Sequence, residues 1–334
     1  MIQENIDITH RHTFGIATQA RAWADYESVD ELRQLIQEAR TRGLEFMPIG
    51  EGSNLLFVKN YEGLLLHSEI NSLNTITLSD NEVLVRAGSG WKWDNFVAYC
   101  VEKGWCGLEN LSYIPGTVGA SAVQNIGAYG TEVCDAIESV TVLDTDTLEE
   151  QILKGNECAY GYRTSRFKGV WRGKYIVTAV TFRLKLTPQY ILDYGNLREI
   201  VGDTPTLQSV REAVIKIRRS KLPEPSELGS AGSFFVNPVI ARKHYNKLLE
   251  QYPDMPCYEI DEQQVKVPAG WLIDHAQWKG KTEGGAMVYP KQCLVIVNTG
   301  NAKAGHVVQL ANDIAFSVFE KYGIIIRPEV NYVY

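Results

Sequence analysis

The sequence lacks the signatures of several common protein classes. It has no Gly-x-x-x-x-Gly-Lys-Ser/Thr segment, and its two Gly-x-Gly pairs are not completed by a third glycine, because Leu55 and Trp93 stand at the required positions. Neither a P-loop nor a Rossmann dinucleotide site is therefore supported. No apolar run approaches the length that spans a bilayer. These absences argue against a membrane-spanning protein and against two common nucleotide-binding folds.

Signs of a metal site or of disulfides are also missing. The six cysteines form no Cys-x-x-Cys pair and no ligand-like group with histidine, so we expect reduced thiols in a cytoplasmic protein. His10 and His12 lie in a polar N-terminal stretch with no further ligand nearby, and we expect them to be solvated. That stretch has neither a basic region nor an apolar region, so it does not resemble a signal peptide. No resident metal is predicted.

There is no basic excess either. The formal net charge of the 334 residues is -7, so no overall positive field would attract nucleic acid or an anionic membrane. An anionic ligand would have to be held by local arginines, lysines and backbone N–H groups. The hydrophobic fraction of 45% and the charged fraction of 22% are those of a globular protein, and the length suffices for roughly two domains.

The patterns along the chain predict mixed α and β structure in two units, with a boundary between Leu186 and Ser209. Capping boxes at Ser28-x-x-Glu31 and Ser209-x-x-Glu212 mark two helix starts. Helices are predicted near 32–43, 96–104, 209–222, 241–251 and 304–322, the last with Phe319 in its apolar stripe. Strands are predicted at 44–49, 64–66, 76–78, 83–87, 175–186, 294–297 and 324–327.

Two segments are too rich in glycine to form the interior of a helix or strand. They are Gly50-Glu51-Gly52-Ser53-Asn54 and the longer stretch from Ile114 to Gly130. Glycine lets the backbone adopt a positive φ and approach a ligand closely, so that successive N–H groups can converge on a phosphate. Each segment alone could equally be a tight connection. Two of them in one half of the chain favour a diphosphate site.

Three further clusters contain residue types that carry chemistry. Ser233 follows a glycine and precedes two phenylalanines, Glu329 stands in an apolar terminal segment, and Arg163 follows two tyrosines. Each also has an ordinary structural explanation, as a turn serine, a carboxylate at a strand edge and an arginine packed against aromatic rings. Ser233 does not stand in Gly-x-Ser-x-Gly, which disfavours a nucleophile-elbow hydrolase. The residues alone predict an enzyme-like protein and no particular reaction.

Taken in order, the motifs resemble the UDP-N-acetylenolpyruvoylglucosamine reductase family of bacteria. The resemblance covers almost the whole chain, and the segment at Tyr194-Gly195 is similar to the substrate-covering tyrosine loop of the type I members. It rests on Thr13-Phe14-Gly15, Gly50-Glu51-Gly52-Ser53-Asn54, Gly107-Leu108-Glu109-Asn110-Leu111, Ile114-Pro115-Gly116-x-Val118-Gly119, Gln124 to Gly130, Tyr162-Arg163, Lys221-Leu222-Pro223, Ala231 to Pro238, Ala269 to Asp274 and Pro328-Glu329-Val330.

The resemblance implies an α+β protein. Its N-terminal half would have the FAD-binding fold of the vanillyl-alcohol-oxidase or p-cresol-methylhydroxylase type, and the C-terminal α+β domain would bind the UDP-sugar. The implied divisions are a FAD-binding region at 1–190 with subdomains at about 1–67 and 68–190, a substrate-binding domain at 205–323, and a terminal strand at 324–334 that returns to the active site.

The family's roles carry over to matching positions. Ser233 corresponds to the proton donor, Glu329 to the catalytic carboxylate and Arg163 to the catalytic arginine. Contacts to the UDP-sugar or to NADPH are implied for Tyr129, Tyr162, Tyr194, Lys221, Asn237 and Gln292. Contacts to the cofactor are implied for Gly50, Gly52, Ser53, Asn54, Pro115, Gly116, Gly119, Ser121, Asn125 and Gly127.

The implied activity is the NADPH-dependent, FAD-mediated reduction of UDP-N-acetylglucosamine enolpyruvate to UDP-N-acetylmuramate in peptidoglycan precursor synthesis. FAD would be bound without a covalent link, and NADPH would be a co-substrate. Nothing in the sequence demands more than a monomer. Two alternatives compete with this function. One is a flavin oxidase of the same superfamily, although neither glycine-rich loop contains the His or Cys that commonly tethers a flavin; the other is a non-catalytic UDP-sugar-binding module.

Overall fold

The computed structural model describes residues 1–224 and 226–334, which form two compact units. The first unit comprises 1–6, 20–51 and 62–218, and the second comprises 7–19, 52–61 and 219–334. The chain therefore crosses between the units several times. One crossing divides the first glycine-rich loop, because Gly50 and Glu51 belong to the first unit and Gly52 to Asn54 belong to the second.

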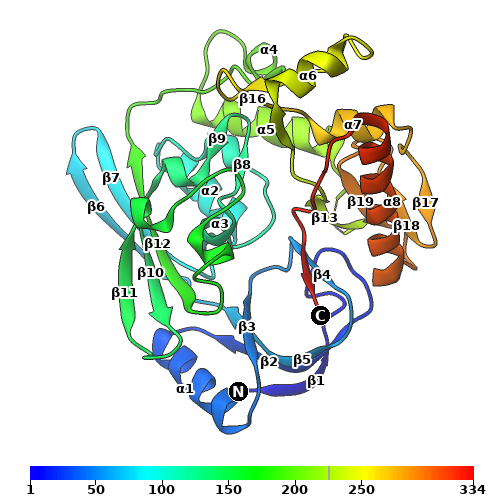
Figure 1. The fold of residues 1–334 in the computed structure, drawn as a ribbon. Coiled ribbons are helices and arrows are strands. Elements are labelled where there is room, and N and C mark those ends of the chain that lie inside the picture. The colour runs from blue at the N-terminus through cyan, green and yellow to red at the C-terminus, as the bar shows by residue number, and fades with distance from the viewer. Residues whose placement is uncertain (225) are drawn as a thin grey trace. The chain divides into compact units, whose positions relative to one another are not determined.

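A small sheet and one helix form the N-terminal part of the first unit (Figure 1). The sheet order is β1 (Gln3–Asp7), β2 (Gln19–Tyr26), β5 (Tyr61–Ser68) and β3 (Phe46–Ile49). Helix α1 (Val29–Thr41) packs on this sheet through its predicted apolar face, and the Ser28 side chain accepts a hydrogen bond from the Glu31 N–H. This bond confirms the predicted cap. It satisfies one of the N–H groups of the first turn that have no acceptor within the helix.

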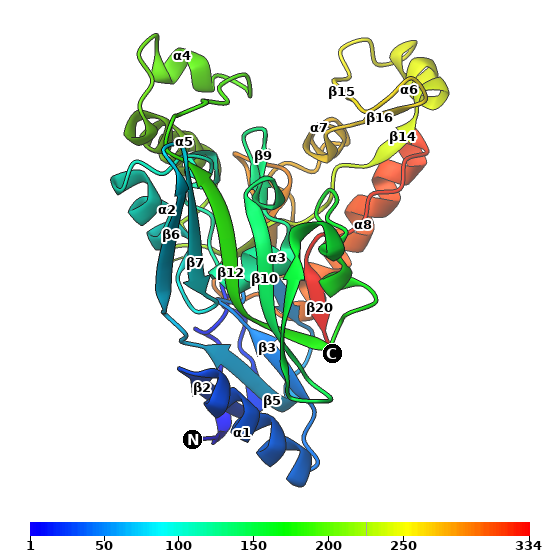
Figure 2. The same ribbon diagram turned by 90° about the vertical axis from the view of Figure 1, so that its left-hand side faces the viewer.

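A five-stranded antiparallel sheet forms the larger part of the same unit (Figure 2). A core of aromatic and branched side chains, including Phe96 and Phe182, joins α2 to this sheet. Most of the buried face of helix α5, including Val210, Val214 and Ile217, lies in a second, smaller hydrophobic cluster. The elements are β11 (Glu150–Lys154), β10 (Ile137–Asp144), β12 (Tyr175–Lys185), β7 (Glu82–Gly88), β6 (Leu73–Ser79), α2 (Trp93–Glu102), α3 (Val118–Gln124), α4 (Leu197–Val201), α5 (Leu207–Lys221) and the hairpin β8 (Gly127–Ala128) and β9 (Thr131–Glu132).

The second unit is built around one long helix and a second four-stranded sheet (Figure 1). Helix α8 (Ala304–Tyr322) buries Val307, Leu310 and Ile314 in its core. The sheet order is β13 (Gly229–Ser233), β19 (Val295–Asn298), β18 (Ala286–Val288) and β17 (Thr282–Glu283). The remaining elements are β4 (Leu55–Phe57), which pairs in parallel with β20 (Asn331–Val333), the sheet β14 (Val239–Ala241), β16 (Gln264–Lys266), β15 (Tyr258–Glu259), and helices α6 (Arg242–Leu249) and α7 (Ala269–His275).

Most of the predicted elements are present, and three details are wrong. Phe319 is 50% exposed and does not belong to the apolar stripe of α8. The predicted strand at 324–327 joins no ladder in the described chain, although Ile324 and Ile326 are buried; an isolated bridge follows at Pro328, and β20 begins at Asn331. Helix α5 begins at Leu207, where Thr206 and Ser209 exchange side-chain and backbone hydrogen bonds, so Ser209 lies inside the first turn.

Candidate active site

The second half of the long glycine-rich segment is organised by one buried asparagine. Asn125 ends α3 in the left-handed conformation, with φ 48°. Its amide nitrogen donates to Glu132 Oε2 at 3.0 Å and to the Gly161 carbonyl at 2.8 Å, and its amide oxygen accepts from the Cys134 N–H at 3.2 Å. Asn125 therefore joins the end of α3, the β8–β9 hairpin and the turn that precedes Arg163.

Arg163 lies against this hairpin. Its guanidinium donates to the Gly127 carbonyl and, at 3.5 Å, to the Asn125 carbonyl, and it lies 3.7 Å from Glu132 Oε1. The backbone of Arg163 has φ 56°, which is uncommon for a residue other than glycine and often accompanies a functional constraint. The guanidinium also lies over the Tyr162 ring, 5.2 Å from its centroid. The structure thus groups four residues predicted for different roles, Asn125, Gly127, Tyr162 and Arg163.

Two of the predicted substrate-contacting tyrosines meet in the first unit. The rings of Tyr129 and Tyr194 make an edge-on contact with centroids 5.8 Å apart. Asn110, which the sequence did not assign to the site, donates from Nδ2 to the carbonyls of both Tyr129 and Ile191 at 2.8 Å. Burial raises the pKa of the Tyr129 phenol, and the charge of Arg218 opposes that rise. Tyr129 therefore remains a neutral hydrogen-bonding group at physiological pH.

Arg218 is a second residue that sequence reasoning missed. It lies near the end of α5, and its Nε donates to the Tyr113 carbonyl at 3.0 Å. Burial lowers the pKa of its guanidinium, which nevertheless stays charged at neutral pH. The neighbouring Arg211 forms a two-point ion pair with Asp94, at 2.6 and 2.8 Å. In the sequence Arg218 was only one of several cations at a helix end, and nothing there distinguished it from a surface charge.

The first glycine-rich loop and the start of α3 approach each other closely within the first unit. A Cβ atom on Gly50 would lie 3.0 Å from Thr117 Oγ1, and one on Gly119 would lie 2.7 Å from the Ser89 Cβ. The Gly116 N–H donates to Glu51 Oε2 at 2.6 Å, next to Pro115 in the predicted cofactor loop. Ser121 is buried, and its hydroxyl donates to the Val118 carbonyl at 2.7 Å.

The remaining part of the first loop lies in the second unit. Gly52 has φ 60°, and a Cβ atom there would lie 2.5 Å from the Cβ of His12. His12 is only 4% exposed, with its Nε2 atom 3.1 Å from the Ile16 carbonyl oxygen, so the expectation of a solvated His12 is wrong. Packing of His12 against Phe57 accounts for its burial. Ser53 and Asn54 follow in the same loop.

Ser233 and Glu329 are brought together in the second unit by two paired backbone segments. Phe235 forms an isolated bridge with Pro328, and the Glu329 N–H donates to the Phe234 carbonyl at 2.8 Å. Asn54 adds a third segment, because its Nδ2 donates to the Glu329 carbonyl at 3.2 Å. Within the described part of the chain, the Ser233 hydroxyl has no protein hydrogen-bond partner.

The other predicted ligand contacts in the second unit occupy different elements. The amide oxygen of Asn237 accepts from the Ala269 N–H at 2.9 Å, at the start of α7. Gln292 lies in the turn before β19, where its Oε1 accepts from the Leu294 N–H at 3.3 Å. Lys221 is exposed and is the last residue of α5.

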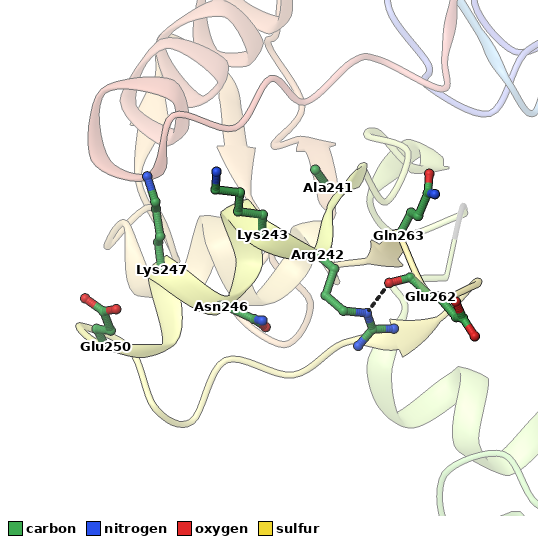
Figure 3. A pocket seen from close by; sticks show the side chains of 8 residues that line it. All are labelled: Ala241, Arg242, Lys243, Asn246, Lys247, Glu250, Glu262 and Gln263. Carbon is green, nitrogen blue, oxygen red and sulfur yellow. Dashed lines mark hydrogen bonds between the residues drawn. The ribbon is translucent and has the colours of Figure 1, made fainter.

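A surface pocket beside α6 contains none of the predicted site residues (Figure 3). Arg242 lines this pocket, donates to the Glu262 carbonyl and forms an ion pair with Glu259, so its charge is paired within the protein. The pocket is lined by Ala241, Arg242, Lys243, Asn246, Lys247, Glu250, Glu262 and Gln263. It is not the predicted site. Among the described residues, moreover, no helix combines the length and hydropathy needed to cross a membrane.

Comparison with known proteins decides the family. The C-terminal domain of UDP-N-acetylenolpyruvoylglucosamine reductase matches residues 224–333, and a FAD binding domain matches residues 20–148. UDP-N-acetylenolpyruvoylglucosamine reductase of Bacteroides fragilis strain YCH46 is 47% identical over 334 residues, which cover 99% of this chain and 100% of the relative. The chain belongs to the UDP-N-acetylenolpyruvoylglucosamine reductase family.

Other relatives agree with this family over almost the whole length. The reductase of Porphyromonas gingivalis strain W83 is 44% identical, with 99% of each chain covered. The crystal structure of the Thermus caldophilus reductase matches with a TM-score of 0.70 at 24% identity, with 99% of both chains covered. The structure of p-cresol methylhydroxylase with bound substrate matches with a TM-score of 0.51 at 12% identity, covering 97% of this chain and 84% of that one. The predicted family and α+β fold class are confirmed.

Proposed function

We propose that this protein catalyses the FAD-mediated reduction of UDP-N-acetylglucosamine enolpyruvate to UDP-N-acetylmuramate, with NADPH as hydride donor. Membership of the reductase family over the full length supports the overall reaction. The observation that carries the assignment to particular residues is the pairing of the segments that bear Ser233 and Glu329. The protein would act as a monomer in the cytoplasm, in the synthesis of peptidoglycan precursors.

The glycine-rich loops fit a bound dinucleotide. Within the described residues, the N–H groups of Gly52 and Asn54 donate to no protein atom. Gly52 has a left-handed backbone conformation, which turns this part of the loop sharply. Two unpaired N–H groups this close together in a turn suit a phosphate. We infer that these two residues, with Gly50, Ser53 and the loop from Pro115 to Gly119, hold the cofactor diphosphate. When bound, FAD carries the hydride from NADPH to the substrate.

The roles of the second glycine-rich segment follow from its packing. Asn125 and Gly127 hold Arg163 rather than offering free donors of their own, since both of their carbonyls accept from its guanidinium. Ser121 stabilises the helix start through its bond to Val118. We therefore propose that these three residues support the site chiefly by shaping α3 and positioning Arg163.

Hydride adds to one carbon of the reacting double bond, and the other carbon, which bears the carboxylate, needs stabilisation of negative charge and then a proton. As hydride adds to the vinyl carbon, negative charge grows on the substrate carboxylate, and the Arg163 guanidinium would stabilise it. The α-carbon then takes a proton from the Ser233 hydroxyl, which needs polarisation because serine is a weak acid. Glu329, on the neighbouring segment, would orient the substrate and support that polarisation.

The diphosphate and uridine of the substrate require further contacts. A chain with a net charge of -7 must hold this anion through local cations and neutral donors. We propose that Tyr129, Tyr162, Tyr194, Lys221, Asn237 and Gln292 serve this purpose or contact NADPH. Arg218 joins them, because it is a partly buried cation whose Nε donates to the Tyr113 carbonyl, while its two terminal nitrogens donate to no protein acceptor within the described chain.

The proposal is tested by an anaerobic visible spectrum of the purified protein. A yellow flavin band should bleach with NADPH and return with UDP-N-acetylglucosamine enolpyruvate, and UDP-N-acetylglucosamine should have no effect. If only oxygen restores the band, the flavin oxidase becomes the better assignment. If flavin is bound but NADPH does not bleach it, a UDP-sugar-binding module is favoured, and absence of flavin contradicts the assignment of the glycine-rich loops.

A further inference from the structure

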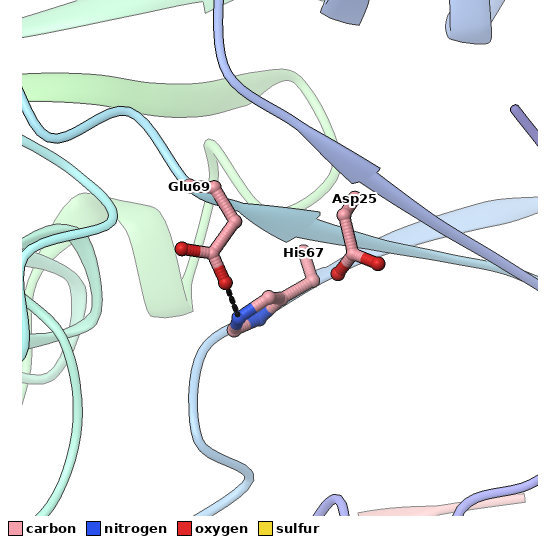
Figure 4. A group of neighbouring side chains, drawn as sticks. All are labelled: Asp25, His67 and Glu69. Atoms are coloured by element: carbon pink, nitrogen blue, oxygen red, sulfur yellow. Dashed lines mark ion pairs between the residues drawn. The ribbon is translucent and has the colours of Figure 1, made fainter.

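Three potential metal ligands gather in the first unit at the strands β2 and β5, which are neighbours in the small sheet (Figure 4). Asp25 lies on β2, His67 on β5 and Glu69 one residue beyond the end of β5. One possible ligand atom from each side chain lies within 4.8 Å of the other two. This group contains none of the residues assigned to FAD or to the substrate.

The hydrogen bonds of His67 determine which nitrogen faces the carboxylates. Its Nδ1 lies 3.2 Å from the Ile49 carbonyl oxygen. Because a carbonyl only accepts, Nδ1 carries a proton, and in the neutral ring Nε2 presents its lone pair. That Nε2 lies 3.2 Å from Glu69 Oε1. A lone pair facing a carboxylate is repulsive, so this geometry calls for a cation: either a second proton on His67 or a metal ion.

The surroundings favour a metal ion. A metal-bound histidine generally donates its second ring N–H to a backbone carbonyl, as His67 does, and such outer contacts fix the orientation of the ligand. Asp25 is held in a similar way, because the indole Nε1 of Trp23 donates to its Oδ1 at 2.9 Å. The Trp23 ring also lies beside the His67 ring, with centroids 5.4 Å apart. Two of the three ligands are thus oriented before any ion binds.

We propose that Asp25, His67 and Glu69 form a site for a divalent transition-metal ion. One imidazole nitrogen and two carboxylate oxygens suit Zn²⁺ or Co²⁺ better than Mg²⁺ or Ca²⁺, which prefer oxygen alone. Water would complete the coordination. The ion would tie β2 to β5 and, through His67, stabilise the end of β3 directly before Gly50. The site is independent of the proposed reductase activity.

The test uses the full chain loaded with FAD and stripped of metal with a chelator. Isothermal titration with Zn²⁺ should show one saturable site per chain. His67→Gln, Asp25→Asn and Glu69→Gln should each weaken binding by about tenfold or more, because each removes one of the ligands. Trp23→Phe removes the hydrogen bond to Asp25 but keeps a large aromatic ring and all three ligands, so it should weaken binding by about tenfold while leaving the site present.

Controls separate this site from other causes of binding. His10→Gln changes an exposed histidine outside the group and should leave the affinity unchanged. Equal affinity in His67→Gln and the parent protein, or no saturable binding at all, would overturn the proposal. So would a Co²⁺ spectrum with thiolate charge-transfer bands, which would place the ion on a cysteine. Loss of FAD from metal-free Glu69→Gln would instead make the group a cofactor contact.

Discussion

Gly127 and Arg163 fit together so closely that no larger residue can stand at position 127 without moving the arginine. A Cβ atom on Gly127 would lie 2.6 Å from Arg163 Nη1, while Arg163 Nη2 donates to the Gly127 carbonyl. The backbone φ of Gly127 is not in the left-handed region, so conformational freedom does not explain the glycine. The space taken by the guanidinium explains it.

Gly127→Ala should therefore displace Arg163, with a smaller strain against the Thr131 carbonyl oxygen, which would lie 3.0 Å from the new Cβ atom. We expect the reoxidation of reduced flavin by the enolpyruvyl substrate to slow by about a hundredfold, which is the usual result of a misplacement of about 1 Å. Stopped-flow absorbance measures this step. Gly305→Ala is the matched control, because a Cβ atom there meets nothing within 4 Å. An unchanged rate would show that the position of Arg163 does not limit the reaction.

Ser233→Ala should separate the two half-reactions. Flavin reduction by NADPH should stay fast, whereas reoxidation by substrate should fall by about 10² to 10⁴, the usual contribution of a general acid. Rapid mixing of each half-reaction provides the measurement, with Ser317→Ala on α8 as the control. Equal losses in both half-reactions would argue for a structural role of the hydroxyl and against proton donation.

Arg218→Gln tests the cation that the sequence did not indicate. Loss of a partly buried positive charge should weaken binding of the anionic substrate, and we expect KM to rise by about tenfold or more while kcat changes less. Arg219→Gln, at the next and more exposed position, is the comparison. If the two variants behave alike, Arg218 contributes only through the general positive potential of the helix end.

Local patterns in the sequence predicted the helices and the motifs well. They did not predict which distant segments contact one another. The apolar spacing of α8 and the glycine after it predicted that helix within a residue, since both signals are local. The adjacency of Ser233 and Glu329 depends on a short pairing between 234–236 and 327–329. No strand pattern marks that pairing, and only the resemblance to the reductase family linked the two residues.

Burial was equally hard to predict where polar residues are concerned. His12 stands in a stretch of polar letters, yet it is enclosed because Gly52 and Phe57 pack against it from another part of the chain. Arg218 shares its sequence context with exposed cations, and only the fold shows that its Nε is bound to Tyr113. A polar side chain is buried when distant segments supply its hydrogen-bond and packing partners. The residues next to it in the sequence do not indicate which segments those are.

Asn125→Ala should destabilise the first unit. The asparagine is fully buried and makes three hydrogen bonds in the left-handed conformation. Leaving its partners unsatisfied should lower the free energy of unfolding by about 3 kcal/mol. Asn125→Gly removes the same bonds without the backbone strain of alanine, so it should lose about 1 kcal/mol less. Denaturant unfolding measures both, and equal losses would show that backbone strain makes no contribution.

The Asp94–Arg211 pair predicts how stability depends on pH. Burial alone would raise the pKa of the Asp94 carboxyl, but the hydrogen bonds from Arg211 and from the Tyr113 N–H outweigh it and hold the pKa below its ordinary value of 3.8. A carboxyl with a lowered folded-state pKa contributes stability that is complete above the unfolded-state pKa and is lost as the pH falls through the folded-state pKa. Asp94→Asn should therefore remove stability at pH 7 and reduce the loss that accompanies a fall in pH below about 4. Urea unfolding across this pH range measures the effect, with Asp80→Asn on the surface as the control. If the stability of Asp94→Asn falls as steeply in acid as that of the parent protein, the pair does not govern acid unfolding.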